Sequence, residues 1–129
     1  MRTRRLIALT MLATALAVPF YALPAIAKEG DVERAGSCSR SSDWKLKLSP
    51  EDGGLEVDFE VDQNVVGAKW KVVMKHDGYR FFRDRRTTKP PSGSFEVRRV
   101  INNKSGSDRV TAKAGNLRTG EVCRGAAKI

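Results

Sequence analysis

The chain has 129 residues, of which 40% are hydrophobic and 30% charged, the balance of one globular domain rather than of a disordered segment. It carries 24 Lys and Arg against 15 Asp and Glu, a formal net charge of +9, but one His and two Cys. So few His and Cys, with no glycine-rich phosphate loop, exclude most metal centres, nucleotide-binding enzyme folds and His-based triads. We therefore expect no metal and no cofactor.

The first 27 residues show the three regions of a secretory signal peptide. Arginines within residues 2–5 precede an apolar run over residues 6–18, and residues 25–27 (Ala-Ile-Ala) form a small-x-small cleavage site. We expect cleavage after Ala27, by general secretion or, given the adjacent arginines, by twin-arginine export. The alternative is a retained membrane anchor, because the apolar segment is nearly long enough to span a bilayer.

Cleavage would leave about 102 residues, with 21 Lys and Arg against 15 Asp and Glu, a net charge of +6. After cleavage, no stretch is apolar enough to cross a membrane. The sequence therefore predicts a secreted or extracytoplasmic protein. The expected partner is an anionic envelope polymer or another protein, and not nucleic acid.

The two cysteines of the chain, Cys38 and Cys123, both follow the signal segment. An even pair in an oxidising compartment predicts a disulfide. Closing a loop of about 85 residues contributes roughly 4–5 kcal/mol in the chain-entropy model. Residues 28–41 are polar and without a period, and we expect a flexible leader there, followed by one domain over residues 42–129.

From Ser42 onward, apolar and polar residues alternate in steps of two, which indicates β-strands. The first two expected strands cover residues 44–48 and 55–61. A turn over residues 49–54 would pair Leu48 with Leu55 and Trp44 with Phe59. Lys47 would then lie opposite Glu56 and Lys45 opposite Asp58.

The third expected strand covers residues 68–75, and Asp77-Gly78 then predicts a tight hairpin. A regular ladder from that turn sets Met74 opposite Phe81. It leaves Val73 and Phe82 together on the outside, as a small apolar pair that suits an interface. The fourth strand becomes basic toward its end, as expected of an edge strand.

Three further strands are expected over residues 95–101, 108–114 and 121–128. Seven short strands predict an all-β, immunoglobulin-like (fibronectin-III-like) sandwich with one disulfide. The first, second and fifth strands would form one sheet, and the third, fourth, sixth and seventh the other. A small closed barrel is the alternative.

Three stretches together resemble small secreted β-sandwich proteins of uncharacterised function from high-GC Gram-positive bacteria. They are residues 41–64 (SSDWKLKLSPEDGGLEVDFEVDQN), 90–100 (PPSGSFEVRRV) and 116–125 (NLRTGEVCRG). The resemblance implies export, the disulfide and the β fold. It implies no activity, and it assigns no catalytic or binding residue.

The strongest candidate site is a basic group that spans the fourth strand and the loop after it. Its members are Arg80, Arg83, Arg85, Arg86 and Lys89, and Arg98 and Arg99 could extend it. Arginine grips phosphate and carboxylate in a forked geometry, so this group is a candidate anion-binding edge. The competing interpretation is edge protection and solubility.

Two other features are interpreted as structural. The acids Glu56, Asp58, Glu60 and Asp62 share one strand face and offer oxygens for Ca²⁺, but alternate positions lie almost 7 Å apart, so we expect a solvated, lysine-paired face. His76, next to the hairpin turn, is expected to be exposed. The serines have no base beside them in the pattern, and the function expected is therefore an exported, non-enzymatic binding or structural module.

Overall fold

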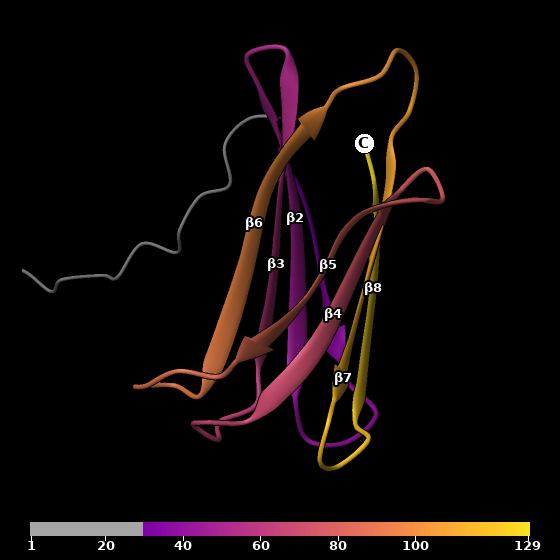
Figure 1. Ribbon diagram of the computed structural model, residues 1–129. Coiled ribbons are helices and arrows are strands. Elements are labelled where there is room, and N and C mark those ends of the chain that lie inside the picture. The colour runs from indigo at the N-terminus through magenta and orange to yellow at the C-terminus, as the bar shows by residue number, and fades with distance from the viewer. Residues whose placement is uncertain (1–29) are drawn as a thin grey trace, which may run out of the picture.

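The computed structural model describes residues 30–129, so the signal-peptide prediction lies outside the described residues. These residues form two four-stranded antiparallel sheets that face each other (Figure 1). The strands are β1 (Val32–Ser37), β2 (Asp43–Glu51), β3 (Gly54–Asp62), β4 (Lys69–His76), β5 (Tyr79–Thr87), β6 (Ser94–Asn102), β7 (Arg109–Asn116) and β8 (Val122–Lys128). The sheet orders are β1-β2-β3-β6 and β5-β4-β7-β8. Within residues 30–129 no helix is long and apolar enough to span a membrane.

The seven expected strands correspond to β2 through β8, and they divide between the two sheets as predicted. The expectation of seven strands is wrong by one, because residues 32–37 of the expected leader form β1. Val32 lies opposite Leu48 and Gly36 opposite Trp44. This strand is held by its ladder with β2 rather than by an apolar pattern, so its sequence carries little strand signal.

The core lies between the sheets and is filled from alternate positions of both. Its largest fully buried side chains include Leu46, Leu48, Phe59, Trp70 and Met74. Burying each side chain of this size contributes about 1.5–3 kcal/mol. The alternation that predicts the strands is therefore the same feature that holds the sheets together.

The β2–β3 hairpin is tighter than predicted. Glu51 pairs with Gly54, so Asp52-Gly53 alone makes the turn, and Gly53 takes a positive φ of 72°. Leu48 therefore lies opposite Val57 instead of Leu55. The predicted register is wrong by two residues. Because strand side chains alternate in steps of two, the same side chains still lie on the inner face.

The β4–β5 hairpin contains a β-bulge that the predicted register lacks. His76 pairs with Tyr79 and Lys75 with Arg80, but the next pair is Met74 with Phe82. One extra residue in one strand turns every later side chain to the opposite face. The expected exposed pair of Val73 and Phe82 is wrong on this account, since Phe82 is buried beside Met74.

The edge where β1 faces β8 is closed by a disulfide and an aromatic ring. Cys38 and Cys123 are bonded, as predicted. Beside them Trp44 lies so close to two glycines that an added Cβ would meet its ring at 3.0 Å from Gly36 and at 2.8 Å from Gly125. The indole fills the space that a side chain at either position would need.

A buried carboxylate holds the β1–β2 loop at this edge. The backbone N–H groups of Arg40 and Ser42 donate to Glu121 Oε2 at 3.0 and 2.9 Å, and Ser42 Oγ donates to Oε1 at 2.6 Å. Burial alone acts to raise the pKa of Glu121, but the hydrogen bonds from Ser42 and Arg40 outweigh it, and the pKa lies below its ordinary value of 4.5.

Replacing Glu121 with Gln should remove a pH-dependent part of the stability. A lowered folded-state pKa stabilises the fold above pH 4.5, and this contribution is lost as the pH falls below that value. Urea unfolding at neutral pH should show Glu121→Gln to be about 1–3 kcal/mol less stable than the parent. The difference in the free energy of unfolding between the two proteins should become smaller in acid. A difference that does not change with pH would contradict this role of Glu121.

Candidate functional site

The outer face of the sheet β5-β4-β7-β8 is covered by basic side chains. Strand alternation places ten exposed Lys and Arg residues there, and we call this surface the basic face. Its members are Lys69, Lys71, Lys75, Arg80, Arg83, Arg85, Arg109, Lys113, Arg124 and Lys128. The single acid in these four strands is Asp84 on the edge strand β5. It lies opposite Val72, but its side chain is exposed and lines a surface hollow with Lys71, Arg83 and Arg85.

Cross-strand pairing places several of these cations directly opposite one another, as with Lys71 and Arg85 or Lys113 and Arg124. Arg83 lies opposite Val73, Val73 opposite Lys113, and Lys113 opposite Arg124, so one row crosses all four strands. Neighbouring strands are about 4.8 Å apart, and like-facing residues along a strand about 7 Å. The face is open and shallow, with a broad hollow lined by Lys71, Val73, Lys75, Gly78, Arg80 and Arg83.

No carboxylate among residues 30–129 forms an ion pair with any of these ten side chains. Like charges held together without counter-charges in the protein raise the local positive potential and attract anions from solution. The face therefore has the electrostatics of an anion-binding surface.

The structure brings together three of the five residues predicted for the anion site. Arg80, Arg83 and Arg85 lie on the basic face, whereas Arg86 and Lys89 do not. Lys89 follows β5 in a loop, where its backbone bonds to Ser94. The prediction missed the cations of β4, β7 and β8, although the outward position of Lys69 and Lys71 is readable from their alternation with Trp70.

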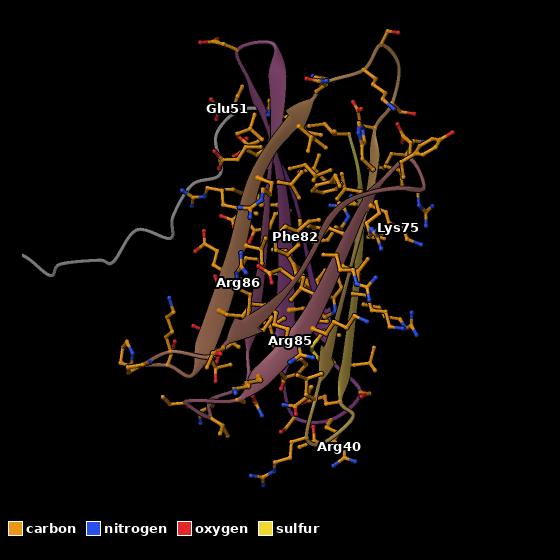
Figure 2. The ribbon with its side chains drawn as sticks, viewed as in Figure 1. Arg40, Glu51, Lys75, Phe82, Arg85 and Arg86 are labelled. Atoms are coloured by element: carbon orange, nitrogen blue, oxygen red, sulfur yellow. A yellow bond between two sulfur atoms is a disulfide. The ribbon has the colours of Figure 1, made fainter. Side chains whose placement is uncertain are left out.

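Arg86 belongs to the edge where β5 faces β6. Its guanidinium lies 5.0 Å from the Phe82 ring centroid, and that of Arg99 lies 4.7 Å from it. Figure 2 shows Phe82 between the sheets with Arg86 beside it. Arg86 Nη1 also donates to Asp84 Oδ2 at 2.9 Å, and the N–H of Arg85 together with this guanidinium lowers the pKa of Asp84.

The outer face of the other sheet carries the four predicted acids of β3. Arg98 crosses this row from β6, with ion pairs of 3.5 Å to Glu56, 3.1 Å to Asp58 and 2.9 Å to Glu96. Burial and the neighbouring Asp58 carboxylate raise the pKa of Glu96. The observed register places Lys47 opposite Asp58 and Lys45 opposite Glu60. The prediction placed them opposite Glu56 and Asp58, two residues earlier in β3.

His76 is buried, and the expectation of an exposed side chain is wrong. Its Nε2 lies 2.6 Å from Asp108 Oδ1 and 3.4 Å from Asp77 Oδ2. Among the residues described, these three could hold a metal ion, since their ligand atoms lie within 4.8 Å of one another. However, Nε2 is hydrogen-bonded to Asp108, and Asp77 Oδ1 accepts the N–H of Arg109 at 2.8 Å. The cluster thus joins the β4–β5 turn to the start of β7.

The chain matches no protein-family model, no curated protein and no solved structure. The resemblance to small secreted β-sandwich proteins therefore stays a prediction. Any function assigned to the chain rests on its own residues and geometry.

Because of the β-bulge, Arg83 and Arg86 have different surroundings, although the sequence places them in one basic group. Arg86→Ala should lower the free energy of unfolding by about 1 kcal/mol, because it removes a cation–π contact with Phe82. Phe82→Ala should lower it by about 3 kcal/mol, while Arg83→Ala should change it by less than about 0.5 kcal/mol. Chemical denaturation measures all three, and an Arg83→Ala loss as large as that of Arg86→Ala would refute the register.

Proposed function

We propose that the protein is an exported, non-enzymatic β-sandwich module that acts by surface binding, and that its basic face holds an anionic polymer of the cell envelope. The observation that carries this proposal is the gathering of ten exposed cations on one sheet face, where the one neighbouring strand acid, Asp84, is paired with Arg86. Export is supported by the disulfide, which is typical of proteins in oxidising compartments.

The sheet orders support the finer assignment to the fibronectin-III-like arrangement. In this proposal β2, β3 and β6 form its three-stranded sheet, and β5, β4, β7 and β8 form its four-stranded sheet. The strand β1 is then an addition at the outer edge of β2. The looser description, an all-β sandwich closed by one disulfide, does not depend on this assignment.

A polymer fits the basic face better than a small anion does. The cations are spread over four strands instead of converging on one point, so a single phosphate or carboxylate would meet few of them. A chain of repeated anions would meet several at once and release their counterions, which gives strong but salt-sensitive binding. In the extracytoplasmic space such chains are wall and surface polymers, which offer the phosphate and carboxylate groups that arginine holds in a fork.

Retention on isolated anionic cell-wall material tests the proposal, with soluble polyphosphate as a defined probe. Affinity should fall by about 10³-fold between about 50 and 200 mM salt if some six anions are contacted. Arg83→Ala with Arg85→Ala should weaken binding at low salt by at least about tenfold.

The matched control is Arg34→Ala with Lys45→Ala, which removes the same charge from the opposite sheet. It should leave retention nearly unchanged. If retention survives high salt, or if both double variants weaken it equally, the basic face does not hold the polymer.

A further inference from the structure

A second concave surface lies at one end of the sandwich, where the β3–β4 connection meets the β7–β8 turn (Figure 1). The hollow has a volume of about 650 Å³, a size typical of small-molecule sites. Six of its lining residues set its polarity and charge. They are Val65, Val66, Leu117, Asn116, Lys69 and Arg118.

The walls of the hollow are apolar and open to solvent. Val65 and Val66 are each 53% exposed and Leu117 is 49% exposed. Within residues 30–129, five large apolar side chains are exposed to this degree, and these three of them line one hollow. Apolar groups gathered in a concavity favour the burial of an apolar ligand.

Hydrogen bonds hold both walls in place. Thr88 is buried, and its Oγ1 donates to the carbonyl of Val65 and accepts the N–H of Ala68, at 2.5 and 2.9 Å. The N–H of Leu117 donates to the carbonyl of Lys69 at 3.0 Å, which ties one wall to the other. The hollow is therefore preformed, and a ligand need not order it.

The Asn116 side chain supports the wall that the β7–β8 turn forms. Asn116 is 5% exposed, and its Oδ1 accepts the N–H groups of Arg118 and Thr119 at 2.9 and 3.0 Å. Those two bonds fix which end of the amide faces the turn. Its Nδ2 is shielded from solvent and is therefore not offered to a ligand in the hollow.

The charge around the hollow is positive. Lys69 and Arg118 line it and are exposed, and none of its lining residues is acidic. The two cations favour a ligand group that carries a negative charge and accepts their hydrogen bonds.

We infer that this hollow binds a small amphipathic carboxylate. The carboxylate faces Lys69 and Arg118, while the apolar body packs on Val65, Val66 and Leu117. This site goes beyond the proposed polymer binding, and it shares only Lys69 with the basic face.

Titration of the disulfide-bonded protein with two carboxylates, followed by NMR, tests the inference. The probes are N-acetyl-leucine and octanoate, which distinguish a peptide-like source from a fatty-acid source. At least one should give saturable shifts confined to residues 63–69 and 116–119. Each probe has a neutral analogue with the same apolar body. If N-acetyl-leucine binds, N-acetyl-leucinamide should bind at least about tenfold more weakly. If octanoate binds, octanol should bind at least about tenfold more weakly than octanoate.

Arg118→Ala removes one of the two cations but keeps the backbone N–H that bonds to Asn116 Oδ1, so it should weaken binding several-fold. Leu117→Ala, at an exposed position, provides a second test that does not endanger the fold, and it should weaken binding several-fold. Val100→Ala, an exposed apolar change on β6, and Arg83→Ala with Arg85→Ala should leave binding unchanged. The last variant separates this site from the basic face, since it should weaken only the polymer interaction.

Three results would overturn the inference. The first is that neither probe gives a saturable shift up to about 10 mM. The second is that the acids and their neutral analogues bind equally. The third is that Leu117→Ala binds with unchanged affinity. Shifts centred on the basic face would likewise assign the carboxylate to that surface and not to the hollow.

Discussion

The register of the β4–β5 hairpin decides both the core and the candidate site. Because of the bulge between Met74 and Lys75, Phe82 points inward, and Arg83 and Arg85 point outward. A regular ladder would reverse these positions, placing Arg83 opposite Val72 in the core-facing row. The same extra residue therefore closes the core at one edge and adds two cations to the basic face.

At each open edge of the sandwich, an aromatic ring fills the gap between the two sheets, with polar or charged groups beside it. At the β1–β8 edge Trp44 lies against Gly36 and Gly125, next to the disulfide and the loop held by Glu121. At the β5–β6 edge the guanidinium groups of two arginines lie over Phe82. With its edges closed, the molecule presents two sheet faces of different charge. Arg98 links the acids of one face, whereas the other carries ten cations, with Asp84 as the one acid beside them.

Most of the fold was predictable because alternation reports which side chains face the core, and seven of eight strands have it. The strand β1 lacks it, since Glu33 and Arg34 sit at a sheet edge where burial is slight. The bulge was not predictable, because an Asp-Gly turn determines only the first pairs beside it. The burial of His76 depends on Asp108, 32 residues away, and the hollow around Asn116 joins two segments whose sequences indicate only a connection and a turn.

Cross-strand proton contacts in the β4–β5 hairpin, measured by NMR on the disulfide-bonded protein, test the central register most directly. The bulged register predicts contacts between Met74 and the Phe82 ring, and between Val73 and Arg83. Contacts of Met74 with Phe81 and of Val72 with Arg83 would contradict it. They would place Arg83 and Arg85 in the inward row and remove both from the face to which polymer binding is assigned.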